Sequence, residues 1–500
     1  MKKTFVIILI ALRLTVYSQE IKTVLEINNY TKVTSYDELT AFINQLDSKS
    51  DLLKADIIGK SVEGRNIYAL KFSSSEFGKD KDKIKVLFFA QQHGNEQSGK
   101  EGALLLAREL LKPGNRYLFD KIDFALIPQM NPDGSEANKR RNGHDADLNR
   151  NHLILTEPET IALHNLFDRY LFEVNMDIHE YSPYGDDWEK YGYRKNADIT
   201  VGTTTNINIS KEIRDLSETG YLPFIENYLS ARKFSFFEYS PGGPPEIEYI
   251  RHSTFDINDG RQSAGIQNTF SFIQEGMNGK DDLIDNIKHR AEGQMNGMRC
   301  MLEYVYQNKD EIKRLVNTER KKLISGSSNK DISIQMVHVR NGEKLKIPLL
   351  SYYSGTDSLV TVNDYRPVVK SLYDVEKPDG YLLPVKSKEL IQWVERQNLY
   401  HLQYKFSGND IIQQYYISTI DSIDFEGDIV VNPKVELKEI TSVNPGEEYI
   451  FIPCSQLKCN LIVTALEPKS MLGLATYKKF ASLLKAGENF PVLRVIKKNN

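Results

Sequence analysis

Two imidazoles and one carboxylate have the residue types and the placement expected of a zinc site. His93 and Glu96 lie three residues apart, directly after the apolar run 86–90. His179 ends a second short run, at residues 174–178. Imidazole nitrogen and carboxylate oxygen both suit Zn²⁺. A single His-x-x-Glu pair is more often an ordinary surface pair, but the third ligand candidate favours a metal. We predict one Zn²⁺ per chain, bound by His93, Glu96 and His179, with an open fourth position for water.

The segments around these residues indicate how they could be brought together. The apolar runs 86–90 and 122–128 are typical of buried strands, and the spacing of apolar residues over 98–111 predicts a helix between them. This order favours a mainly parallel sheet covered by helices, an α/β fold. Parallel strands bring their ends to one edge of the sheet, where such folds hold their sites. A later predicted strand, 269–276, places Glu275 at its end.

A polar segment lies between the two strands that carry the metal ligand candidates. It contains Asn-Pro-Asp-Gly at 131–134, which is a turn sequence in any protein, and three arginines, Arg140, Arg141 and Arg150. Basic residues usually form a solvated surface. Next to a metal site, however, the guanidinium fork matches a carboxylate bidentately and its charge does not titrate. We therefore predict a substrate with a free carboxylate.

Length and composition limit the remaining possibilities. Five hundred residues exceed what one core usually supports. We expect a signal peptide at 1–19, a catalytic domain at 20–325 and a β-rich accessory domain at 331–500, because short alternating apolar runs follow a Ser-Gly-rich stretch. The basic start and short apolar core predict export to the periplasm or the extracellular space, with no integral membrane segment in the mature chain. A net charge of −4 excludes a general nucleic-acid footprint.

Several smaller features were interpreted in the same way. Residues 281–307 predict one long helix, and the charged residues 308–330 are expected to continue helically until a Ser-Gly-Ser-Ser-Asn stretch interrupts them. Residues 181–205 are typical of a long loop beside a site. Cys454 and Cys459 could form a disulfide or remain buried thiols.

Taken in order, the motifs resemble those of the zinc carboxypeptidase family. They are His93-Gly94-Asn95-Glu96, Asn131-Pro132-Asp133-Gly134, Asp147-Leu148-Asn149-Arg150-Asn151, Asp177-Ile178-His179 and the late-strand Glu275. The resemblance covers residues 55–300 and is to a secreted, bacterial-type member with a C-terminal β-rich domain. It implies hydrolysis of the peptide bond next to a free C-terminal carboxylate through a zinc-activated water.

The resemblance also implies a role for each matching residue. Glu275 would be the general base, and Arg140, or its neighbour Arg141, would stabilise the oxyanion. Asn149 and Arg150 would bind the terminal carboxylate, Asp147 would orient the first zinc histidine, and Tyr239 would close over the substrate. The sequence departs from digestive members at Asn95, where they carry an arginine, and in the position of Glu275 along its strand.

Two other functions fit the same residues. One is a zinc amidohydrolase of cell-wall peptides or acyl-amino acids. The other is a catalytically silent relative that binds peptides or glycans. The pattern does not indicate the preferred terminal residue; Asp256, Asp259 and Arg261 are candidates for the specificity pocket.

Overall fold

The computed structural model describes residues 21–406, 410–441 and 446–497. The predicted signal peptide lies outside these residues. The described chain begins with two helices, α1 (Val24–Ile27) and α2 (Tyr36–Lys49). Glu38 and Ser35 form a reciprocal capping box at the start of α2, which satisfies backbone N–H groups that no helical carbonyl can reach.

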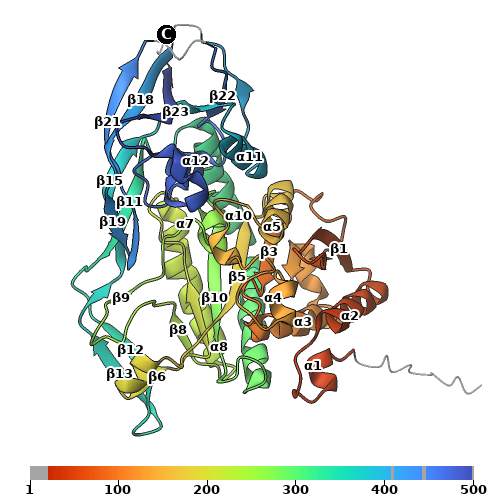
Figure 1. Cartoon of the computed structure of the whole chain (residues 1–500). Coiled ribbons are helices and arrows are strands. Elements are labelled where there is room, and N and C mark those ends of the chain that lie inside the picture. Colours follow the sequence, from red (N-terminus) through yellow and green to blue (C-terminus); the bar gives the residue numbers. More distant parts are fainter. Residues whose placement is uncertain (1–20, 407–409, 442–445, 498–500) are drawn as a thin grey trace, which may run out of the picture.

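An eight-stranded mixed sheet forms the centre of the first part of the chain (Figure 1). Its spatial order is β1-β2-β4-β3-β5-β10-β7-β8, and the four middle strands, β4, β3, β5 and β10, are mutually parallel. The strands are β1 (Leu53–Lys60), β2 (Asn66–Phe72), β3 (Ile84–Ala90), β4 (Ile122–Ile127), β5 (Val174–Tyr181), β7 (Ile199–Gly202), β8 (Phe236–Glu238) and β10 (Phe270–Met277). The predicted α/β fold class is confirmed.

Helices cover both faces of this sheet, so its four middle strands are buried along almost their whole length. Alternate residues of β3 point to opposite faces: Val86 and Phe88 belong to one buried cluster, and Leu87 and Phe89 to another. The first cluster includes side chains of α2, α3 (Gln97–Leu110), α8 (Leu222–Ser230) and α10 (Ile287–Ser325). The second includes side chains of α5 (Pro158–Tyr170) and α9 (Gly260–Gly265). The shorter helices of this part are α4 (Pro132–Glu136), α6 (Asp186–Lys190) and α7 (Lys211–Leu216).

The local predictions had mixed outcomes. The helix expected at 98–111 is confirmed as α3. The long helix begins at Ile287 rather than 281 and continues to Ser325, with non-helical φ and ψ angles at Asn308. The loop expected at 181–205 is wrong in part, because it contains α6, β6 (Tyr193–Lys195) and β7. β7 pairs antiparallel with β10, so hydrogen bonding to a preformed strand edge orders a segment without a clear strand pattern.

The C-terminal region, residues 331–497, is rich in antiparallel strands, as predicted. A six-stranded sheet in the order β17-β22-β16-β23-β18-β21 forms its main part. The helices are α11 (Lys388–Arg396) and α12 (Cys459–Leu466). The strands are β11 (Asp331–Val339), β12 (Leu345–Ser351), β13 (Asp357–Val362), β14 (Tyr365–Arg366), β15 (Val368–Glu376), β16 (Gly380–Pro384), β17 (Leu402–Gln403), β18 (Asp410–Thr419), β19 (Ser422–Phe425), β20 (Asp428–Val431), β21 (Lys434–Ile440), β22 (Tyr449–Pro453) and β23 (Asn489–Lys497).

This region packs along one side of the first part of the chain (Figure 1). β12 pairs with β6, and β14 pairs with β9 (Ile250–Arg251). The indole nitrogen of the buried Trp393 donates to the carbonyl of Leu153 at 2.9 Å. One buried apolar cluster contains residues of both parts, including Leu153, Phe255 and Ile266 from the first. The boundary placed between 325 and 331 stays a prediction, since the two parts share a core.

All three cysteines lie among the described residues and are buried free thiols. Of the two alternatives for Cys454 and Cys459, the structure therefore has the buried thiols. Within the described ranges, no helix combines the length and the apolar character needed to cross a membrane.

Candidate metal centre

The loop after β3 carries two of the predicted ligands and is held in a tight conformation. Gln91 has a left-handed backbone (φ 60°), and its side-chain amide donates to the carbonyl of Gly94 at 3.0 Å. A Cβ atom on Gly94 would lie 2.1 Å from the carbonyl carbon of Gly134 in α4. Real side chains do not approach this closely, so the loop requires glycine at this position. Glu96 then forms the N-cap of α3, which directs its side chain back toward His93.

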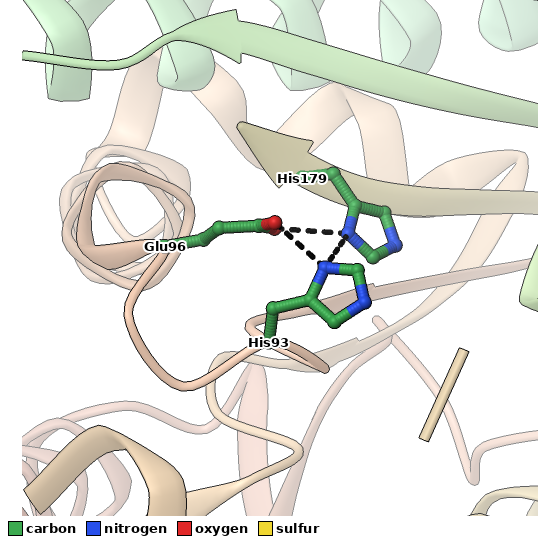
Figure 2. A group of neighbouring side chains, drawn as sticks. All are labelled: His93, Glu96 and His179. Carbon is green, nitrogen blue, oxygen red and sulfur yellow. Dashed lines mark hydrogen bonds and ion pairs between the residues drawn. The ribbon is translucent and has the colours of Figure 1, made fainter. Parts of the chain in front are cut away.

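His93, Glu96 and His179 point toward one another (Figure 2). Glu96 Oε1 lies 2.6 Å from His93 Nδ1, and Glu96 Oε2 lies 2.9 Å from His179 Nδ1. The two imidazole Nδ1 atoms are only 3.1 Å apart, and all three side chains are buried. Burial by itself would raise the pKa of Glu96, but the two neighbouring histidines hold it well below its usual range. The structure thus brings the three predicted ligands together.

The donor atoms fit Zn²⁺ because the outer nitrogen of each imidazole faces a carboxylate. His93 Nε2 lies 3.2 Å from Asp147 Oδ1, and His179 Nε2 lies 2.8 Å from Asp177 Oδ1. A carboxylate at Nε2 keeps the proton there and leaves the lone pair of Nδ1 free for a metal. Two such nitrogens and a carboxylate, each offering one atom within 4.8 Å of the others, form the ligand set of a zinc site with an open position.

Glu275 lies beside the ligands on the neighbouring strand. In the parallel pair β5–β10, Glu275 is directly opposite His179, and both are buried. β10 continues two residues past Glu275, so this carboxylate lies inside the strand rather than at its end. Burial raises the pKa of Glu275 to about 7, Glu96 adds to the rise, and the two histidines oppose it. A carboxylate with such a pKa can accept and release a proton near neutral pH.

The two adjacent arginines have different surroundings. Arg140 donates from Nε and Nη2 to Asp147 Oδ2 at 3.1 and 3.0 Å, and its Nη1 lies 3.2 Å from His93 Nδ1. The side chain of Arg140 is 47% exposed, so part of the guanidinium faces solvent beside the ligands. Arg141 instead donates to the carbonyl of Asp145 at 2.9 Å on the exposed surface. The structure brings Arg140 to the metal ligands and leaves Arg141 away from them.

Asn149 and Arg150 are also placed differently from each other. The buried Asn149 accepts at Oδ1 from the backbone N–H of Gly260 at 2.8 Å, and its Nδ2 lies 3.3 Å from His179 Nε2. Asn149 therefore holds the start of α9 through Oδ1, and its amide nitrogen lies next to a metal ligand. Arg150 is exposed, donates to the carbonyl of Asn149 at 2.8 Å, and lines a cavity. Of the predicted pair, Arg150 is the residue free to receive a substrate carboxylate.

The cavity next to Arg150 has a volume of about 310 Å³. Tyr239 also lines it, and burial together with the charge of Glu275 raises the pKa of the Tyr239 phenol. Among the three candidates for a specificity pocket, Asp256 lines this cavity. Asp259 and Arg261 instead form a buried ion pair with each other at 2.8 Å.

Two parts of this site were not predicted from the sequence. Asp177 lies in the motif Asp177-Ile178-His179, but no function was predicted for it. A two-residue step along a strand keeps both side chains on one face, so Asp-x-His carried a usable signal. The second part is the β19–β20 hairpin of the C-terminal region, which lines the cavity through Phe425, Glu426, Asp428 and Val430. No local motif marks these residues as part of a site.

Comparisons with known proteins agree with the motifs. Residues 39–197 match the zinc carboxypeptidase family (Peptidase_M14). The chain is 23% identical over 448 residues to carboxypeptidase 2 of Trichophyton rubrum, covering 87% of this chain and 81% of that protein. It is 27% identical over 237 residues to carboxypeptidase D of Homo sapiens, covering 40% of this chain and 17% of that protein.

Solved structures give a weaker likeness. A metallo-carboxypeptidase from Burkholderia cenocepacia has a TM-score of 0.43 at 20% identity, covering 54% of this chain and 69% of that one. Carboxypeptidase A from Helicoverpa armigera has a TM-score of 0.44 at 19% identity, covering 56% and 75%.

The family match spans the first two ligands and the third, His179, and it includes Asp147 and Arg150. Together with the buried cluster of two histidines and a glutamate, it establishes a metallocarboxypeptidase, a hydrolase with a zinc site. Residues 39–197, which hold all three ligands, therefore match the zinc carboxypeptidase family.

Proposed function

We propose that this chain is an exported exopeptidase that removes the C-terminal residue from peptides. The observation that carries this proposal is the convergence of three zinc ligands with a general-base candidate, Glu275, directly opposite His179. Arg150, which is exposed, follows Asn149 in the chain and lines a cavity, supports recognition of a terminal carboxylate. Export rests on the basic and apolar start of the sequence alone. The proposal is not restricted to bacterial relatives, since fungal proteins match along most of the chain.

The residues divide the chemistry among them. Zinc at His93, Glu96 and His179 would supply a Lewis acid and lower the pKa of the attacking water. Glu275 takes a proton from that water and passes it to the nitrogen of the leaving amine. Arg140 offsets the negative charge that develops on the carbonyl oxygen, a contribution of about 3 kcal/mol per donor. Arg150 binds the terminal carboxylate with its guanidinium fork.

Two positions have a supporting role in the proposal. Asp147 accepts from both Arg140 and His93, so it fixes the oxyanion donor relative to a ligand. Asn149 accepts at Oδ1 from the N–H of Gly260, so we assign it to holding the start of α9 against the site. Tyr239 lines the cavity and can pack on the bound terminal residue.

The test measures zinc content and the release of C-terminal residues from a peptide library by purified protein. Glu275→Gln should keep stoichiometric zinc and lose about 10²- to 10⁴-fold in kcat, the usual contribution of a general base. Glu226→Gln is a matched control, because Glu226 is exposed on α8, and it should behave as wild type.

Other outcomes would distinguish the alternative functions. Release of amino acids from acyl-amino acids or muropeptides, but from no ordinary peptide, would replace the proposal with a zinc amidohydrolase. A zinc-loaded wild type that is inert on all of these substrates would support a silent binding relative.

A further inference from the structure

The cavity beside Arg150 has walls from both parts of the chain. The first part contributes Arg150, Tyr239, Arg251 and Asp256, whereas the C-terminal region contributes Glu426, Asp428, Met471 and Tyr477. Its volume of about 310 Å³ is at the lower end of the range for pockets that bind small ligands. Since Arg150 is the carboxylate-binding candidate, the side chain of the same terminal residue must lie next to it, inside this cavity.

With a substrate carboxylate bound to Arg150, the side chains of the cavity would carry more negative than positive charge. Arg251 forms an ion pair with Glu426, with Nε and Oε2 3.2 Å apart. Glu426 Oε1 also lies 2.6 Å from His338 Nδ1, so both of its oxygens are engaged. Arg150 is neutralised by the substrate carboxylate. Two carboxylates, Asp256 and Asp428, then remain without a cation.

Asp256 is the more enclosed of these two. Its Oδ1 atom is buried and has no hydrogen-bond partner among the described residues. A buried polar atom without a partner costs free energy, and such atoms are rare in folded proteins. Phe255 stacks on His338 and Phe425 of the C-terminal region, with centroids 5.1 and 5.6 Å away. These contacts fix the loop so that Asp256 faces the cavity. Asp428 is exposed on the β19–β20 hairpin.

The hairpin turn also has a defined geometry. Its two central residues, Glu426 and Gly427, both have positive φ angles, 53° and 99°, as two-residue hairpin turns require. This conformation presents Glu426 to Arg251, which keeps that arginine occupied. The apolar rings of Phe425 and Tyr477 line the same cavity and can contact an aliphatic stem.

We propose that the C-terminal region completes the pocket for the substrate's last side chain, and that this pocket selects lysine or arginine through Asp256 and Asp428. The inference rests on the proposed exopeptidase function. Arg150 and Asp256 together bind the opposite charges of one terminal residue, its carboxylate and its side-chain cation. The Arg251–Glu426 pair excludes acidic side chains, because it leaves no unpaired cation for them.

The test compares kcat/KM on acylated dipeptides that share one penultimate glycine and end in Lys, Arg, Leu, Gln or Glu. Wild type should favour Lys and Arg over Leu by at least about 30-fold, the usual loss when a buried charge lacks its partner. Asp256→Asn should lower this preference at least about tenfold. Glu426→Gln should release Arg251 and raise the relative rate on Glu. Glu439→Gln, an exposed carboxylate on β21 outside the cavity, should leave the whole profile unchanged.

Zinc content and near-ultraviolet circular dichroism separate a local effect from misfolding in each variant. A wild type that prefers Leu or Glu over Lys and Arg would overturn the proposed pocket while leaving the exopeptidase function intact. The same holds if Asp256→Asn and Glu426→Gln fold, bind zinc and keep the wild-type profile. Failure of the zinc-loaded wild type on every peptide would instead remove the proposed function itself.

The pH dependence gives a second readout of the same pocket. Burial and the charge of Glu426 raise the pKa of Asp256 to about 7, Asp259 adds to the rise, and Arg150 and Arg251 oppose it. Asp256 gains its charge as the pH rises through this value, so the ratio of Lys to Leu hydrolysis should increase between pH 6 and pH 8. Titration of Glu275 affects both substrates equally and cancels in the ratio. The ratio should not depend on pH in Asp256→Asn.

Discussion

At the residue scale, each imidazole of the metal centre has a carboxylate behind it. Asp147 was expected from its position two residues before Asn149, whereas Asp177 was not. Asp177 also accepts at Oδ2 from the side chain of Gln92 at 2.9 Å, and Gln92 in turn accepts from His152 at 2.8 Å. This buried chain of polar groups fixes the carboxylate, which then fixes the ring of His179. Partners of this kind commonly change metal affinity by about 10- to 100-fold.

Asp177→Asn should therefore weaken zinc binding by about 10- to 100-fold. The amide is neutral, so it no longer favours the tautomer with its proton on Nε2. Titration against a competing chelator measures the affinity directly, without any substrate. Asp120→Asn provides the control, because Asp120 is exposed and lies before β4, away from the ligands. Unchanged zinc affinity in a folded Asp177→Asn protein would mean that the backbone of β5 alone suffices to orient His179.

At the scale of elements, the site depends on a close contact between the loop after β3 and the short helix α4. The N–H of Gly94 donates to the carbonyl of Arg140 at 3.2 Å. The side chain of Asn131 accepts from the N–H of Gly134 at 2.8 Å and donates to the carbonyl of Gln92 at 3.1 Å. The turn sequence at 131–134 thus positions both the ligand loop and the backbone of Arg140.

Gly94→Ala should displace this loop and lower zinc occupancy. The added Cβ would lie 2.1 Å from the backbone of Gly134, and backbone cannot give way as a flexible side chain does. Overpacking of this kind costs about 1 to 3 kcal/mol of unfolding free energy, which urea denaturation would measure alongside zinc content. Gly114→Ala is the matched control, because no atom lies within 4 Å of the position that its Cβ would take. Equal stability and zinc content in the two variants would contradict this account of the loop.

The sequence predicts an element well when the local pattern of residues determines that element. It predicts an element poorly when contacts with distant segments determine it. The apolar runs before His93 and His179 predicted parallel strands, and the ligands followed from their shared edge. β7 could not be predicted, because four residues at the edge of β10 have no strong pattern of their own. Arg140 and Arg141 were indistinguishable for a similar reason, since only the fold around Asp147 decides which of the two faces the ligands.

At the scale of the whole molecule, the C-terminal region is part of the structure around the site rather than a tethered module. Gln397 donates to the carbonyl of Leu153 at 2.8 Å, and Asn460 donates to the carbonyl of Asn208 at 2.7 Å. Lys458 forms an ion pair with Asp168 at 2.8 Å. These partners satisfy buried polar groups of the first part, which would lose them if the C-terminal region were absent.

A fragment of residues 21–325 should therefore fail to fold as the full chain does. Without the C-terminal region, the fragment would expose apolar side chains that are buried in the shared cluster of the full chain. They are Leu153, Ile209, Phe255, Ile257 and Ile266. A contiguous apolar surface of this kind favours aggregation, and the pocket would lose one wall. We expect the fragment to be insoluble or, if soluble, to unfold in urea without a cooperative transition. Circular dichroism would follow urea unfolding of the fragment and of the full chain side by side. A soluble fragment with a cooperative transition and stoichiometric zinc would mean that the first part folds alone. In that case, the C-terminal region would act on substrate selection only, and the fragment should cleave peptides with a reduced preference for lysine and arginine.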